Sequence, residues 1–157
     1  MTSTATVTLP ADTQVLITRR FAAQRHLVYR AWTTPELIRR WWHANRGEVT
    51  DIEVDLRVGG QWRYVMIAEG GFEVAFHGEY LEIVPDSKLV TTEIYEAAPE
   101  HPAQTTATFS DDGDGTLVTL LVEHVSQAAR DAMINSGMEY GLQDALNLLE
   151  QVALAEV

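Results

Sequence analysis

The sequence predicts an α+β fold, in which a curved antiparallel sheet of six to seven strands wraps around a long C-terminal helix and two short helices follow the first strand. Apolar residues recur at helical spacing in only two segments, residues 24–42 and 126–155. Between residues 48 and 124, apolar and polar residues alternate, as they do in half-buried strands. The turns in that region lie too close together for the crossovers that parallel strands need, so we expect an antiparallel sheet.

The N-terminal part is expected to hold a tail, one strand and two helices. Residues 1–12 are expected to be a flexible tail, and residues 13–157 a single domain. The first strand is expected at residues 15–21 and the first helix at residues 24–33. Thr34 should cap a second short helix through its hydroxyl, with Pro35 at the first helical position, where no amide donor is needed. That helix is expected to run to about Trp42.

Six further strands are expected before the C-terminal helix. In the first of them Ile52, Val54, Leu56 and Val58 share one face, and glycines then end the strand. The alternation slips past Gly78, which predicts a bulge or bend. The expected strands cover residues 48–58, 61–66, 72–84, 88–96, 105–110 and 116–124.

The C-terminal segment is expected to be one long helix from a cap at Ser126 to about Ala155. Its apolar residues, among them Met133, Leu142 and Leu149, recur at spacings of three, four and seven and form a broad core-facing stripe. A sheet that folds around a single long helix tends to leave an apolar space between the two. The fold therefore predicts an internal cavity.

Charge and composition exclude several classes of function. The net charge is −12, distributed as +3 over residues 1–63 and −15 over residues 64–157. An acidic body repels phosphate backbones, so nucleic-acid binding is not expected. No apolar run is long enough to span a bilayer, and membrane insertion is not expected. The chain has no cysteine, which fits a cytoplasmic location. The nine arginines of residues 1–63 are expected to pair with acidic strands; the alternative is a docking surface for an acidic partner.

The candidate ligand-binding residues are large apolar and aromatic side chains on strands and on the last helix. Trp62, Tyr64 and Met66 share one strand face and lie beside a similar face on the next strand. A buried phenol needs a hydrogen-bond partner, which a ligand can supply. The alternative for all of these residues is simple core packing. The expected ligand-binding set is Trp42, Trp62, Tyr64, Met66, Phe76, Tyr80, Tyr95, Met138 and Leu142.

No motif for metal binding or nucleophilic catalysis is present. The five histidines include no pair at helical i, i+4 spacing, and no serine lies in a nucleophile motif. The acidic hairpin around Asp112 and Asp114 departs from a calcium loop and is interpreted as a solvated turn. His77 is expected to pair with Glu79 on an exposed strand face. The sequence therefore assigns no catalytic residue, no metal site and no cofactor.

Several segments together resemble a known family over nearly the whole chain past residue 15. They comprise Arg19-Arg20-Phe21, Val28 to Thr33, Pro35-Glu36-Leu37, Arg40-Trp41-Trp42, Val58 to Tyr64 and Gly78 to Pro85. The sequence resembles the START-like superfamily (SRPBCC), with its helix-grip fold, and within it the heat-shock-protein-90 ATPase activator homologue-like family. The resemblance implies a cavity between sheet and helix of the kind that holds lipids, polyketides or other apolar molecules. The eukaryotic co-chaperone has a further N-terminal domain for its chaperone contact, so chaperone activation is not carried over.

Three functions remain open at this point. The first is non-catalytic binding of a hydrophobic or aromatic small molecule, lipid-like or polyketide-like, in the cavity. The second is a cyclase, dehydratase or hydrolase that uses the same cavity, with Tyr64, Tyr80, Tyr95 and His77 as candidates for proton transfer. The third is a protein-interaction or chaperone-associated module. A homodimer is an open alternative that no residue demands.

Overall fold

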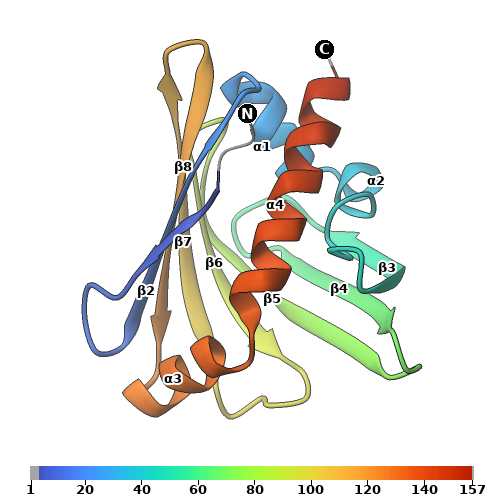
Figure 1. Cartoon of the computed structure of the whole chain (residues 1–157), viewed down its shortest axis with the longest axis vertical. Coiled ribbons are helices and arrows are strands. Elements are labelled where there is room, and N and C mark those ends of the chain that lie inside the picture. Colours follow the sequence, from blue (N-terminus) through green and yellow to red (C-terminus); the bar gives the residue numbers. More distant parts are fainter. Residues whose placement is uncertain (1–3, 157) are drawn as a thin grey trace.

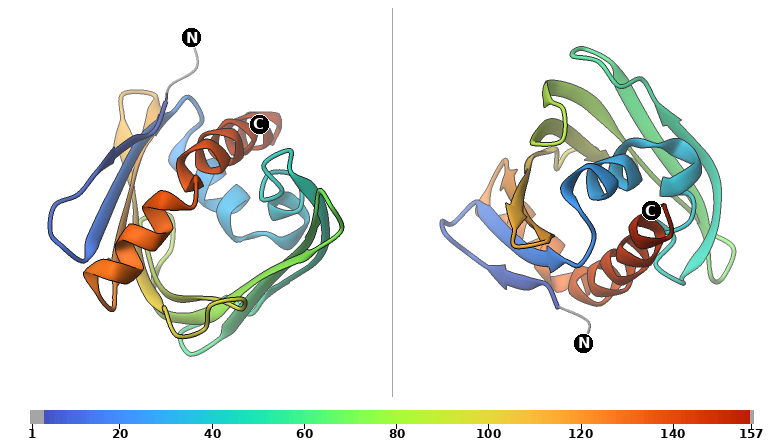
Figure 2. Two further views of the ribbon diagram at one scale, coloured as in Figure 1. Left: turned by 60° about the horizontal axis from the view of Figure 1, so that its bottom comes forward. Right: turned by 90° about the horizontal axis from the view of Figure 1, so that it is seen from above.

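The computed structural model describes residues 4–156, which form one eight-stranded antiparallel sheet and four helices (Figure 1). The strand order across the sheet is β1-β2-β8-β7-β6-β5-β4-β3. The sheet curves around α4, and α1 and α2 lie beside one end of that helix (Figure 2). The elements are β1 (Thr6–Thr8), β2 (Gln14–Phe21), α1 (Arg25–Thr33), α2 (Pro35–Ile38), β3 (Gly47–Val54), β4 (Gln61–Ala68), β5 (Glu73–Val84), β6 (Lys88–Tyr95), β7 (Ala103–Asp112), β8 (Gly115–His124), α3 (Gln127–Asn135) and α4 (Met138–Ala155).

The α+β architecture is confirmed, but the sheet has one strand more than the upper expected count. β1 lies within the segment that we expected to be a flexible tail, and it pairs antiparallel with the edge of β2. Val7 packs against the core, and the backbone of Ala5 exchanges two hydrogen bonds with the Gln143 side chain, each 2.9 Å long. The tail expectation is therefore wrong for this strand, because these contacts fix it. Residues 1–3 lie outside the described residues.

The two short helices follow the expected positions with two corrections. In α1 Leu27, Val28 and Ala31 are buried, as helical spacing predicted. Pro35 does occupy the start of α2, but the Thr34 side chain makes no capping hydrogen bond. The helix ends at Ile38 rather than near Trp42, and the chain continues through turns.

The first strand after the helices is shorter than expected. β3 ends at Val54, and Leu56 and Val58 are 42% and 62% exposed rather than part of a buried strand face. The chain instead turns early, with the Asp55 amide bonded to the Gln61 carbonyl and Gly59 in the left-handed region at φ 83°. The predicted irregularity past Gly78 is present as a register shift in the β5–β6 pair, just after Tyr80.

The C-terminal helix is divided in two. Ser126 caps α3 as predicted, since its side chain accepts a hydrogen bond of 3.1 Å from the Ala129 amide. Gly137 then adopts φ 81°, a left-handed conformation that ends a right-handed helix and that glycine tolerates well. The prediction of a single long helix is therefore wrong, because the helix is interrupted at this glycine. Only α4 runs along the inside of the sheet (Figure 2).

Most of the N-terminal arginines are paired. Eight of the nine form ion pairs with acidic side chains, and Arg19 is the most buried of them, bonded to Glu150 at 3.2 Å and Asn147 at 2.7 Å. The pairing itself matches the expectation, but the partners are mostly not on strands: only Arg20 and Arg25 pair with strand residues, both in β7, and four of the arginines pair with α4 or with Glu156 at its end. Within residues 4–156, none of the helices has the length and apolar character needed to cross a membrane.

Candidate ligand pocket

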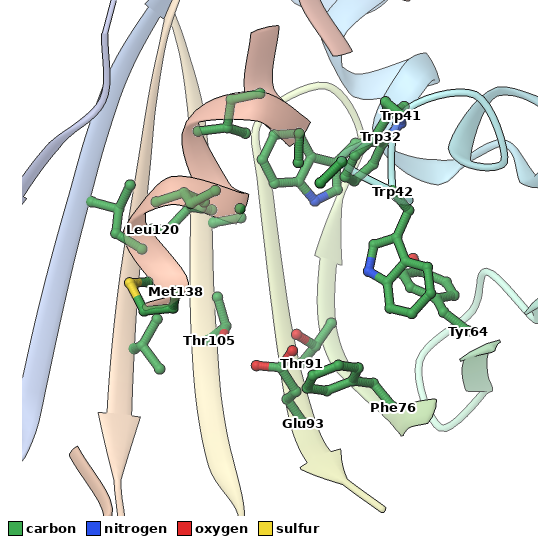
Figure 3. Close-up of a pocket in the computed structure, with 18 of the residues that line it drawn as sticks. Trp32, Trp41, Trp42, Tyr64, Phe76, Thr91, Glu93, Thr105, Leu120 and Met138 are labelled. Atoms are coloured by element: carbon green, nitrogen blue, oxygen red, sulfur yellow. The ribbon is translucent and has the colours of Figure 1, made fainter. Parts of the chain in front are cut away.

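A pocket of about 590 Å³ lies between the inner face of the sheet and α4. Its walls come from β4 to β8, from α3 and α4, and from the turns after α2, with single residues from β2 and α1. Figure 3 shows Met138 and Leu120 on one side of this space and Trp42, Tyr64 and Phe76 on the other. The volume falls within the range of about 300–1,000 Å³ that is typical of small-molecule sites.

The structure brings together eight of the nine residues that the sequence assigned to ligand binding. Those lining the pocket are Trp42, Trp62, Tyr64, Met66, Phe76, Tyr80, Met138 and Leu142. Tyr95 does not line it: this residue ends β6, is 38% exposed and stacks on Phe76 with ring centroids 4.9 Å apart. Its contribution is therefore to support an aromatic wall from outside.

The aromatic wall is a set of mutually packed rings from two strands and the turn after α2. Trp42 meets Tyr64 edge-on at 5.5 Å and Phe76 at 6.0 Å, while Trp62 lies 4.8 Å from Tyr64. Strand alternation puts these side chains on one face, since Trp62 and Tyr64 are two residues apart on β4. Gly78 lies opposite Trp62, and a Cβ there would come within 2.8 Å of the indole nitrogen. The Thr92 carbonyl oxygen of β6 would be closer still, so both the β6 backbone and the Trp62 ring exclude a side chain at this position.

The wall formed by α3 and α4 combines flexible methionine side chains with a glycine that leaves space. Met133 and Met138 supply flexible apolar side chains from α3 and α4. Gly141 also lines the pocket, and a Cβ placed on it would meet no atom within 4 Å. The absence of a side chain at this helical position therefore leaves free space in the wall.

Polar groups in the pocket were missed by the sequence analysis. Thr91 and Glu93 of β6 and Thr105 of β7 line it, and the Glu93 carboxyl points into it (Figure 3). Strand alternation shows which residues of β6 share a face, but it does not show which of the two faces points into the pocket. The two faces of β6 are equally apolar, since each carries two large apolar residues, one threonine and one charged residue, so hydrophobicity alone does not decide which way Glu93 points.

Burial changes the acid–base properties of three pocket residues. It raises the pKa of Glu93, because the charged carboxylate loses water without gaining a cation. Burial likewise raises the pKa values of Tyr64 and Tyr80, with nearby acidic groups adding smaller contributions. Both phenols are therefore neutral at ordinary pH and can donate or accept a hydrogen bond. No side-chain hydrogen bond joins any of the three to another residue within 4–156.

The other sequence candidates lie outside the pocket. His77 is on the opposite face of β5 and contacts Glu96 at 2.8 Å rather than the expected Glu79. Arg63 donates two hydrogen bonds of 2.9 Å to the same Glu96 carboxylate. Arg63 and His77 together lower the pKa of Glu96 to about 2. Asp112 pairs with Arg20, as fits a solvated turn. Residues 4–156 contain no group of three or more acidic or histidine side chains arranged to hold a metal ion.

Comparison with known proteins agrees with this fold. Residues 22–153 match the family model described as Activator of Hsp90 ATPase homolog 1-like protein. A crystal structure from Rhodobacter sphaeroides, 24% identical, superposes with a TM-score of 0.89 over 98% of this chain and 99% of that chain. Proteins from Nitrosomonas europaea (25% identity, TM-score 0.83, 94% and 98% coverage) and Chromobacterium violaceum (26%, 0.80, 91% and 98%) are similar. No functionally curated protein matches the chain.

Proposed function

The chain belongs to the Activator of Hsp90 ATPase homolog 1-like family, and from this premise we propose that it binds a hydrophobic or aromatic small molecule, lipid-like or polyketide-like, without converting it. The observation that carries the proposal is the pocket of about 590 Å³ between the sheet and α4. The residues proposed to contact the ligand are Trp42, Trp62, Tyr64, Met66, Phe76, Tyr80, Met138 and Leu142, with Tyr95 supporting Phe76 from outside.

The composition of the pocket supports an apolar guest. Its walls are largely aromatic and aliphatic, with few polar groups, which is the usual pattern of sites that bury most of a small ligand. Apolar area removed from water contributes about 25 cal/mol per Å², so a bicyclic guest gains affinity from burial alone. The polar groups then fix its orientation.

Intrinsic fluorescence offers a direct test, because all four tryptophans of the chain line the pocket. We expect the neutral probe 2-naphthylmethanol to change tryptophan emission with saturation. The melting temperature should also rise with probe excess, since a ligand at a hundred times its Kd stabilises the folded state by about 2.7 kcal/mol. Unchanged emission and melting temperature with this probe, decanol and a flavonoid alike would refute the proposal.

A second candidate, proton-transfer catalysis in the same pocket, is favoured by one observation. Glu93 is a carboxyl with a raised pKa inside an apolar site, which is how enzymes prepare a general acid or base. In this function Glu93 would take a proton from the carbon next to a carbonyl and return it. Deuterium exchange into 2-tetralone, followed by NMR, tests it: exchange that Glu93→Gln abolishes supports catalysis, and exchange at the buffer rate excludes this reaction.

A further inference from the structure

Glu93 stands out in the pocket because nothing else in the described chain balances it. Its side chain makes no hydrogen bond or ion pair with any residue from 4 to 156, and burial alone raises its pKa. By contrast, Glu96, three residues on, binds both Arg63 and His77. By accessible surface Glu93 is half-buried, so water in the pocket reaches its carboxyl, but a carboxyl in an apolar site with no cation beside it favours a ligand that brings one.

The protein itself does not supply that cation. Arg46 is the one cationic side chain among the described residues that line the pocket, and it is bound to Asp144 at 2.6 Å. The other titratable residues there are Tyr64 and Tyr80, both with raised pKa values and hence neutral. β7, β8, α3 and α4 contribute only apolar, hydroxyl and glycine residues to the lining. In the empty pocket only water solvates the Glu93 carboxylate, and a cationic group on the ligand can take the place of that water.

The surroundings of Glu93 favour a cation over a neutral donor. Glu93 and Phe76 line the pocket from the neighbouring strands β6 and β5, and the Trp42 ring lies 6.0 Å from Phe76 and 5.5 Å from Tyr64 (Figure 3). Aromatic faces attract cations, and an acidic protein with a net charge of −12 raises the local concentration of cations. Thr91 and Thr105, which face each other across β6 and β7, add hydroxyl acceptors within the same pocket.

We propose that the ligand is an amphipathic monocation, whose aromatic or aliphatic body fills the pocket and whose protonated amine donates hydrogen bonds to Glu93. This inference rests on the proposed function and narrows it to a class of ligand. The aromatic wall and the methionines hold the body, and the carboxylate sets the end at which the amine lies.

The pH dependence of such a complex has a defined sign. An ammonium ion favours the carboxylate form, so binding of the amine lowers the pKa of Glu93 toward its ordinary value. Amine affinity is therefore full above the pKa that Glu93 has in the empty pocket and falls as the pH drops through it. A neutral probe of the same shape shows no such loss, because it has no charge to pair.

The test uses three probes that share one ring system and differ in charge. Calorimetric titrations at pH 7 compare 2-naphthylmethylamine, 2-naphthylmethanol and 2-naphthoate. We expect the amine to bind about tenfold tighter than the alcohol or better, and the anion weakest, since hydrogen bonds to charged groups are the strong ones. Glu93→Gln should remove the advantage of the amine over the alcohol.

Glu96→Gln is the matched control. It removes the same charge three residues away, on the outer face of the sheet, and should keep the preference for the amine. Equal loss in both variants would mean that overall charge steers the amine, and would overturn the role of Glu93. If Glu93→Gln does not fold, a pH series on the unmodified protein replaces it, because acid protonates the same group.

The outcomes separate the two proposals. Equal affinity for amine and alcohol, or tighter binding of the alcohol or the anion, overturns the monocation and leaves small-molecule binding standing. Binding of none of the three probes counts against both. If Glu93→Gln still prefers the amine, the ammonium group binds at a site other than Glu93, which also overturns the inference.

Discussion

Substitution of Gly141 tests whether the space beside α4 is open. A Cβ at this position meets nothing within 4 Å, so Gly141→Ala adds a methyl group without a clash. Alanine is favoured over glycine inside a helix by about 0.8–1.0 kcal/mol. Each 1 kcal/mol raises the melting temperature of a chain of this size by about 2–4 °C. We therefore expect Gly141→Ala to melt a few degrees higher and to bind 2-naphthylmethanol as the unmodified protein does.

Gly141→Phe extends the same test from one methyl group to a whole ring. Its phenyl group would project into the pocket of about 590 Å³, where burial of a Phe side chain is worth about 1.5–3 kcal/mol. A probe that displaces the ring forfeits this energy, so its affinity should fall by about 10- to 150-fold. Fluorescence titration measures the affinities and circular dichroism checks the fold.

Two results would refute this reasoning. A lower melting temperature for Gly141→Ala would mean that Gly141 is packed against other atoms. Unchanged probe affinity in Gly141→Phe, with the fold intact, would mean that the probe binds somewhere other than between the sheet and α4.

Three further predictions concern stability. Glu93→Gln should stabilise the empty protein at pH 7, because burial raises the pKa of Glu93 in the folded state and the charged carboxylate therefore destabilises it. The gain in the free energy of unfolding develops as the pH rises from the ordinary pKa of 4.5 through the raised value. Equal urea unfolding of the variant and the unmodified protein at pH 7 would contradict this. Glu96→Gln should slightly lower the free energy of unfolding at pH 7, since Arg63 and His77 stabilise the carboxylate form of Glu96. This loss should disappear as the pH falls from 4.5 to about 2, and a loss of stability that does not depend on pH would exclude this origin. Ser126→Ala should lower the free energy of unfolding in urea by about 0.5–2 kcal/mol through loss of the α3 cap, and an unchanged value would show that the cap contributes nothing.

Most of the fold was predictable because most of its elements carry a local signal. Strand alternation and the closely spaced turns identified the antiparallel sheet, and Ser126 marked the start of the C-terminal helical region. The divided helix was missed because Ser136 and Gly137 interrupt an apolar stripe that continues on both sides. The early end of β3 was missed because Leu56 and Val58 keep the strand alternation in a segment that the structure leaves exposed.

The pocket was only half predictable. Its aromatic wall follows from strand faces, and so Trp62, Tyr64 and Phe76 could be named before the structure was known. Glu93 could not, because both faces of β6 carry polar residues, and only the pairing of β6 with its neighbours decides which face turns inward. Tyr95 keeps the parity of the pocket-facing residues but lies at the strand end, beyond the pocket wall.

A crystal structure of the protein grown with 2-naphthylmethanol tests the central claim most directly. The account predicts electron density for the naphthalene ring between α4 and the aromatic wall of Trp42, Tyr64 and Phe76, with those side chains close to their present positions. Density for side chains that fill this space, or for the probe at an outer surface with the interior closed, would contradict it.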